Sequence, residues 1–230
     1  TFVGNNQFNG GLTSSTDILV NNATIGLGGG AISTNIAFGQ NALLSNTTAT
    51  NNLAIGNGAL QLNTTAVSNI AIGTNALGSQ SFSGNGYNIA IGPGVLNLLG
   101  STGGANAQLS QNTIIGANSG KLMTIGARNT IIGAAVWQNS NNAERNTGLG
   151  RGVLSVIGQD AGIGSGSKYN TAIGHNALFT FDSGSNNTFI HGGSNAGDGV
   201  IYGSNNNVIG MDSGLPSEME SNTIIGRGIA

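Results

Sequence analysis

The chain has 230 residues, of which only 6% are charged, 41 are Gly and none is Cys, and its formal net charge is −2. A chain of this charge lacks the polybasic surface that neutralises phosphates, so nucleic-acid binding is not expected. The sequence also lacks a long apolar run of the kind that spans a bilayer. Without cysteine it has neither disulfides nor thiolate metal ligands.

A five-residue pattern recurs twelve times: Asn, any residue, a small or apolar residue, a large aliphatic or aromatic residue, and Gly. The copies begin at Asn22, Asn35, Asn52, Asn69, Asn88, Asn112, Asn129, Asn146, Asn170, Asn187, Asn206 and Asn222. From Asn35 onward the intervals are 16 or 17 residues at most steps, and 19 or 24 at the others. A fixed period of this kind is typical of a solenoid. We therefore predict an all-β, parallel β-solenoid of about 17 residues per coil over residues 22–230, with an entry segment from a preceding shaft or coil at 1–21.

The residue before the Gly is large in every copy, and because side chains alternate along a strand we expect this column to fill the interior. Its principal Ile members are Ile55, Ile72, Ile91, Ile115, Ile132, Ile173 and Ile225. The residue before that is mostly apolar too, as in Ala54 and Ile114. A strand that is apolar on both faces is buried on both. Neighbouring copies of the same chain are the simplest cover for the second face.

Two further features repeat with the coils. Stacked coils would bring the Asn residues to about 4.8 Å from one another, so their side chains are expected to form an amide ladder. After the Gly comes a second apolar piece, such as Gly58-Ala59-Leu60, which we expect to form a corner followed by a second strand. The corner residue is mostly Asn or Gly, which accept a left-handed backbone readily. The two longest intervals predict side loops near 99–110 and 157–168.

Three copies share a longer phrase: Asn-Leu-Ala-Ile-Gly-Asn-Gly-Ala-Leu at 52–60, Asn-Ile-Ala-Ile-Gly-Thr-Asn-Ala-Leu at 69–77 and Asn-Thr-Ala-Ile-Gly-His-Asn-Ala-Leu at 170–178. These phrases resemble the head repeats of YadA-like trimeric autotransporter adhesins and the similar repeats of phage tail fibres. Over residues 22–230 the resemblance implies a left-handed parallel β-roll in a homotrimer, its chains intertwined or side by side, with binding surfaces outside. The repeat is longer than is typical of adhesin heads, which favours the fibre branch.

Aromatic side chains are the candidates for stacking on sugars. Tyr87 and Tyr169 end polar return segments just before a strand, and Trp137 takes the place of a Leu in the second apolar piece. If the protein binds glycans, we expect stacking on these rings. For Trp137, a place in the core or between subunits is the favoured interpretation.

The histidines, His175 and His191, are the side chains suited to general-base chemistry near neutral pH. His175 takes a variable corner place and His191 replaces a repeat Gly, so we expect a corner substitution at the first and a structural irregularity at the second. No pair of acidic residues recurs at a repeat interval, although a glycan-cleaving tailspike needs two neighbouring carboxylates. We predict no catalytic residue, no metal site and no cofactor.

These observations predict a non-enzymatic, extracellular fibre segment, in a virion tail fibre or on a bacterial surface. Three weak sites would gain avidity from their common attachment. The expected partners are the other subunits of a homotrimer and a host-surface receptor, either a glycan or an outer-membrane protein, with no nucleic acid and no membrane insertion.

Two alternatives remain: an ice-binding solenoid and a glycan-cleaving tailspike. Regular Thr residues such as Thr113, Thr130 and Thr147 favour ice binding. Their place on the same strand face as the expected core Ile column counts against it.

Overall fold

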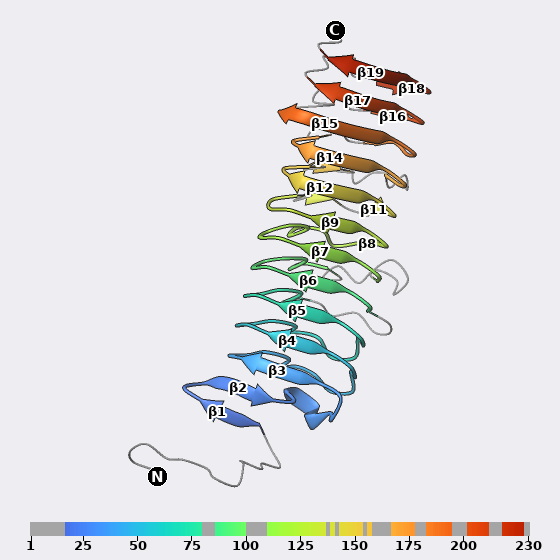
Figure 1. Cartoon of the computed structure of the whole chain (residues 1–230). Coiled ribbons are helices and arrows are strands. Elements are labelled where there is room, and N and C mark those ends of the chain that lie inside the picture. The colour runs from blue at the N-terminus through green and yellow to red at the C-terminus, as the bar shows by residue number, and fades with distance from the viewer. Residues whose placement is uncertain are drawn as a thin grey trace.

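The computed structural model describes residues 17–79, 86–99, 110–136, 139–140, 143–153, 156–157, 167–177, 183–194, 202–211 and 218–227. The chain coils into a long rod with its two ends at opposite tips (Figure 1). The described part holds short β-strands and one 3-10 turn, η1 (Gly29–Ala31), and none of its helices has the length and hydropathy to cross a membrane. The sequence-predicted side loops near 99–110 and 157–168 lie almost entirely outside the described residues.

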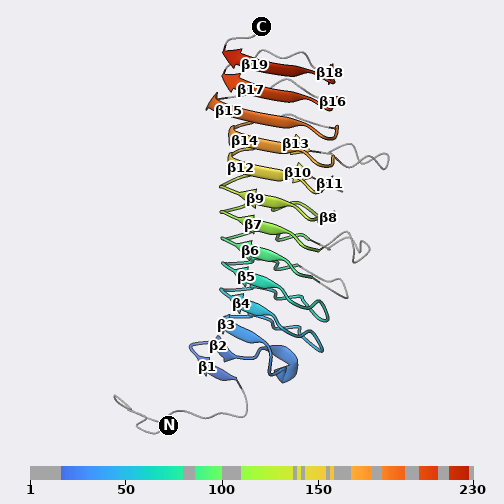
Figure 2. The same ribbon diagram turned by 45° about the vertical axis from the view of Figure 1, so that its right-hand side comes forward.

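One sheet runs along the whole rod, one strand from each coil (Figures 1 and 2). Its strands, in spatial order, are β1 (Ile18–Val20), β2 (Ala23–Gly26), β3 (Ile36–Gly39), β4 (Leu53–Ile55), β5 (Ile70–Ile72), β6 (Ile89–Ile91), β7 (Thr113–Ile115), β9 (Thr130–Ile132), β12 (Thr147–Arg151), β14 (Thr171–His175), β15 (Thr188–Ser194), β17 (Asn207–Met211) and β19 (Thr223–Arg227). Shorter parallel pairs form between β8 (Gly126–Ala127) and β11 (Ala143–Glu144), β10 (Asn139–Ser140) and β13 (Val156–Ile157), and β16 (Tyr202–Ser204) and β18 (Glu218–Glu220).

From β3 onward neighbouring strands of this sheet are parallel, and equivalent repeat positions pair, as in Ala54↔Ala71 and Ile55↔Ile72. The predicted all-β parallel solenoid of about 17 residues per coil is therefore confirmed.

The copy at Asn22 is not a coil, so the prediction of twelve equivalent coils is wrong at its first member. β1, β2 and β3 pair antiparallel, and Asn22 is an exposed turn residue. Only 13 residues separate Asn22 from Asn35, too few for a full coil, so the chain doubles back as a hairpin. The Asp17 carboxylate accepts hydrogen bonds from the backbone N–H groups of Leu27, at 2.7 Å, and Gly28, at 2.8 Å. The hairpin thus covers one end of the parallel ladder, where an open edge would invite pairing with other chains.

The interior of a single chain is filled by the other column of the strand, which corrects the sequence-based assignment. The residues two places before the repeat Gly are the buried ones, including Ala37, Ala54, Ala71, Ala90, Ile114, Ile131, Ala172, Phe189 and Val208. The expected core residues Ile55, Ile72, Ile91, Ile115, Ile132, Ile173 and Ile225 point outward; the first five and Ile173 lie at intermediate exposure or above, and Ile225 is 72% exposed. Alternation places the Asn and the residue two places on inward together.

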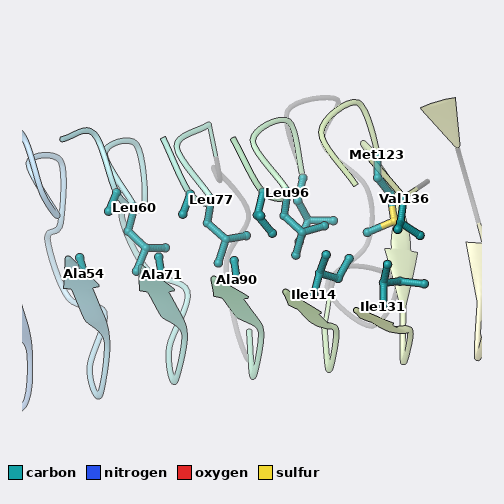
Figure 3. Close-up of a cluster of buried hydrophobic side chains, with 14 of the residues drawn as sticks. Ala54, Leu60, Ala71, Leu77, Ala90, Leu96, Ile114, Met123, Ile131 and Val136 are labelled. Atoms are coloured by element: carbon teal, nitrogen blue, oxygen red, sulfur yellow. The ribbon is translucent and has the colours of Figure 1, made fainter. Parts of the chain in front are cut away.

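Each coil is thin, and its core pairs a small residue with a large one. In successive coils Ala54, Ala71 and Ala90 on the strands face the buried Leu60, Leu77 and Leu96 on the opposite side of the coil (Figure 3). Where the strand residue becomes Ile114, the equivalent of those Leu residues is Gly120. A Cβ on Gly120 would lie 3.1 Å from Leu96 Cδ2 and 3.2 Å from Ile114 Cδ1. The volumes on the two sides of a coil therefore compensate.

The second apolar piece forms a turn, where a second strand had been expected. Ala59 N–H bonds the Gly56 carbonyl at 3.3 Å, and Leu60 N–H bonds Ala76 of the next coil at 3.0 Å. The expected left-handed corner is confirmed, with φ of 67° at Gly58 and 55° at Asn75. Leu60 and Leu77 are also left-handed, at φ 50° and 49°, which turns their side chains into the core in place of continuing a strand.

The predicted Asn ladder is confirmed from Asn35 to Asn222. At each step the backbone N–H of one Asn donates to the side-chain Oδ1 of the Asn one coil earlier, at 2.9–3.2 Å. From Asn69 onward the side-chain amide donates to the same oxygen. The ladder residues from Asn35 to Asn206 are buried, so the ladder is a polar spine inside the rod.

The repeat Gly is required because coils approach closely beside it. At Gly56, where φ is 127°, an added Cβ would lie 2.7 Å from the carbonyl carbon and oxygen of Gly73. The copy in which His191 replaces this Gly shows a register irregularity: Ile173 pairs with Ile190, but His175 pairs with Ser194. The irregularity expected at His191 is therefore confirmed.

Candidate binding surfaces

The outward face of the main sheet carries a continuous aliphatic column. Strand alternation places the residue before each Gly on this face. Phe38, Ile132, Leu149, Ile190, Ile209 and Ile225 are 37–72% exposed. Exposed apolar side chains in a row along a rigid sheet form the kind of patch that marks a protein interface.

A second outward column runs beside the first and changes chemistry along the rod. It is aliphatic in β3 to β6, at Ile36, Leu53, Ile70 and Ile89. It then becomes mostly hydroxyl-bearing, at Thr113, Thr130, Thr147, Thr171, Thr188 and Thr223. The two halves of this face therefore differ: the N-terminal half is wholly aliphatic, and the C-terminal half is an aliphatic column next to a polar one.

A third surface lies at the corner where the return segment enters the strand. The residue immediately before each ladder Asn adopts a left-handed backbone there, with φ of 48–62°. In five successive coils this residue is Tyr87, Gln111, Arg128, Arg145 and Tyr169, which we call the corner column. All five are exposed. At about 4.8 Å per coil, the column extends over roughly 19 Å.

Polar contacts tie the middle of this column together. Arg128 Nε donates to Gln111 Oε1 at 3.0 Å, and Arg128 Nη1 also pairs with the Glu144 carboxylate. Arg145 Nη1 lies 2.9 Å from Glu144 Oε1 and 2.9 Å from the Tyr169 hydroxyl. Its guanidinium carbon is 5.2 Å from the centre of the Tyr169 ring. The orientation of Tyr169 is therefore set by a neighbouring cation.

Three cations surround one carboxylate at this corner. Lys168 Nζ completes the set, 3.1 Å from Glu144 Oε2. Burial raises the pKa of the Glu144 carboxyl, but hydrogen bonds from Lys168 and Arg128 and the charges of Lys168 and Arg145 outweigh it, so the pKa lies below its ordinary value. Glu144 is ionised at neutral pH, and the cluster of Arg128, Arg145, Lys168 and Glu144 keeps two positive charges in excess.

The structure joins two of the three aromatic candidates. Tyr87 and Tyr169 occupy the same place in their coils and stand at the two ends of the corner column, about half exposed. Trp137 lies outside the described residues.

The histidines lie elsewhere. His175 follows Gly174 at the opposite end of its strand, where its Nε2 is 3.4 Å from Arg151 Nη1. His191 is on β15, a strand whose side chain at this position is not described. Among the described residues, no group of three or more His, Cys, Asp or Glu side chains is placed to hold a metal ion.

The charged members of the corner column were missed by the sequence-based choice of site residues. The signal was present: Arg128 and Arg145 precede ladder Asn residues, as Tyr87 and Tyr169 do. Aligning the repeats by that place, and not by the core pattern alone, brings the four side chains into one row. Glu144 and Lys168 stand one residue earlier and pair as neighbours across coils.

Comparison with protein-family models, with curated proteins and with solved structures finds no significant match to this chain.

Proposed function

We propose that this chain is the rigid, adhesive segment of an extracellular fibre, part of a phage tail fibre or a bacterial surface adhesin, and that three copies assemble through the outward aliphatic face. In this proposal it has no catalytic role. The resemblance of its repeats to adhesin heads and tail-fibre repeats supports this function, as does its left-handed β-roll implied by that resemblance.

The observation that carries the proposal is the uncovered aliphatic column. Isolated exposed apolar residues are ordinary, but a row of them in adjacent coils is not. Each stacked Ile, as in Ile72 beside Ile91, would leave water when a neighbouring copy packs on it. The low charge of the chain, 6%, fits a surface of which a large part is covered by other subunits.

Rigidity and number of sites are the proposed mechanism. Backbone ladders and the buried Asn spine hold the coils in a fixed stack. Three copies of any weak binding surface on one trimer then act together, which raises the effective affinity for a surface that displays many receptors.

Saturable attachment to cells tests this function. The fluorescently labelled chain is expected to bind some strains of a bacterial panel, and excess unlabelled chain is expected to displace it. An Ile72→Asp/Ile91→Asp variant, made monomeric by charge on the outward face, should lose avidity. A chain that binds no strain saturably, or a monomeric variant that binds equally well, would contradict the proposal.

A second candidate function is ice binding, which one observation favours. The column of Thr113, Thr130, Thr147 and Thr171 had been expected on the core side, but it lies on the outward face with regular spacing along a flat sheet. Repeated hydroxyls of that kind can order water. Thermal hysteresis in a freezing assay, abolished by Thr130→Asp/Thr147→Asp, would establish this function instead.

A further inference from the structure

We infer that the corner column, Tyr87 to Tyr169, is a binding track for an acidic polysaccharide that lies along the rod axis. This inference rests on the proposed attachment function, whose receptor class it specifies. The ligand would carry carboxylate or sulfate groups on a chain of sugars.

Charge is the first argument. Apart from Asp17, the first 120 residues of the chain carry no acidic or basic side chain. Against this neutral background Arg128, Arg145 and Lys168 gather at one corner around the single carboxylate of Glu144. An anion arriving there meets two uncompensated positive charges. Arg binds carboxylate and sulfate-like oxygens through its planar fork, so the two guanidinium groups suit acidic substituents of a sugar chain.

Shape is the second argument. The two Tyr residues bound the charged middle at the two ends of a straight row roughly 19 Å long. Tyr presents a rigid, amphipathic surface with little conformational entropy to lose, which suits stacking on a sugar ring. Glu144 positions Arg128 and Arg145, and Arg145 positions Tyr169. The row is therefore organised before a ligand arrives.

Backbone strain is the third argument. In other coils the place before the ladder Asn is taken by small polar residues, such as Asn51, Ser68 and Asn186. Asn in particular tolerates a left-handed backbone at little cost, whereas Arg and Tyr at φ 48–59° do not. Four large side chains in adjacent coils at a place that small residues fill elsewhere indicate a use for those side chains.

Nucleic acid suits this row less well than a polysaccharide. The whole chain carries a net charge of −2, and three cations with one carboxylate neutralise few phosphates. The two Tyr rings are four coils apart, so they do not offer the successive platforms on which neighbouring bases stack.

The test measures binding of the full chain to polygalacturonate and dextran sulfate, with neutral dextran and oligothymidylate as comparisons. The variant Arg128→Gln/Arg145→Gln uses a residue already found in the column, Gln111, and Tyr87→Ser/Tyr169→Ser uses the Ser found at Ser68. The control Lys121→Gln/Arg151→Gln also removes two exposed cations, both outside the column. Thermal unfolding verifies that each variant is folded.

We expect one of the acidic polysaccharides to bind, with neutral dextran not binding. The Arg pair variant should weaken binding by about tenfold or more, because charge-assisted hydrogen bonds are lost, and the control should remain within about twofold. The Tyr pair variant should weaken binding several-fold. Equal losses in the Arg variant and the control would show general attraction of polyanions and overturn the inference.

Two other results also overturn it. One is tighter binding of oligothymidylate than of either acidic polysaccharide. The other is saturable attachment to cells that the Arg and Tyr variants leave unchanged, which rejects the track while the attachment function stands. Loss of cell attachment by the wild-type chain itself would reject the proposed function separately.

Discussion

A buried Asn at the same place in each coil is the residue-level device that holds this rod together. One Oδ1 atom accepts from both the backbone N–H and the side-chain amide of the next Asn, as Asn52 does from Asn69 at 2.9 and 3.2 Å. The Asn52 amide in turn donates to the Ala66 carbonyl at 3.1 Å, which closes its own coil. Each ladder Asn therefore joins two coils and seals one of them.

Removing one rung should destabilise the fold substantially. Asn52→Ala deletes these bonds inside the rod, so we expect a loss of about 1–3 kcal/mol or more in the free energy of unfolding. Chemical denaturation measures it. Asn57→Ala is the matched control, since Asn57 is exposed and bonds only Gln40 at 3.0 Å among the contacts described for it; it should change stability by less than about 0.5 kcal/mol. Similar losses in the two variants would show that the ladder has no special role.

Glu144 predicts a stability contribution that depends on pH. Its pKa in the folded chain lies below its ordinary value, so its contribution is complete above the unfolded-state pKa of about 4.3 and is lost as the pH falls through the folded value. Glu144→Gln should therefore lower the Tm at pH 7 and have a much smaller effect near pH 3. The exposed Glu218→Gln is the control and should show no such convergence. A Tm difference for Glu144→Gln that is the same at both pH values would contradict this account.

At the scale of one coil, the decisive feature is the fit between strand and turn. Ala71 and Leu77 face each other in one coil, whereas Ile114 faces Gly120 in another. The sum of the two side chains is conserved more closely than either of them. This explains how strands with Ala and strands with Ile alternate in one stack without cavities.

Changing one side of this pair should reveal the coupling. Ala71→Ile overfills its coil and should cost about 1–3 kcal/mol in stability. Adding Leu77→Gly makes room and removes a left-handed Leu at φ 49°, so the double variant should recover part of the loss. Equilibrium unfolding of both single variants and the double variant gives the coupling energy. Strictly additive effects would show that the two positions do not share one space.

Much of the coil could be predicted from the sequence, because the features concerned are local. The Asn ladder, the close approach at the repeat Gly, the left-handed corner and the irregularity at His191 all follow from residue types at fixed offsets. Which strand face is internal does not follow, since alternation shows only which residues share a face. The inward Asn and the turn Leu residues decide it, and their roles depend on contacts across the coil. The turn at Leu60 was taken as a strand for the same reason.

The candidate binding surface divides in the same way. Tyr87 and Tyr169 were recognised as exposed aromatic residues, but the sequence-based choice treated them singly. Arg128 and Arg145 join them only when coils are stacked in register, which places residues 17 or 24 apart next to each other. The hairpin at Asn22 was missed because its five residues match the repeat, while the length that would let it coil is lacking.

For the whole molecule, the unexplained quantity is the outward face. Across β3 to β19 of the described part, adjacent strands bring aliphatic side chains into one continuous row, and no part of the same chain is described as covering it. A row of that length is costly for a single chain in water and is readily covered by copies of itself. The account therefore predicts association through Ile72, Ile91 and their neighbours, with the inward Ala column belonging to the fold of each chain.

Light scattering of the purified chain tests this claim most directly. The account predicts a solution mass near 68 kDa, three times 22.8 kDa. Ile72→Asp/Ile91→Asp should bring the mass toward 22.8 kDa while the β-sheet circular dichroism is retained, whereas Ala71→Asp should unfold the chain because it places a charge in the interior. A wild-type chain that remains at 22.8 kDa at micromolar concentration would contradict the claim that copies of this protein cover the aliphatic face.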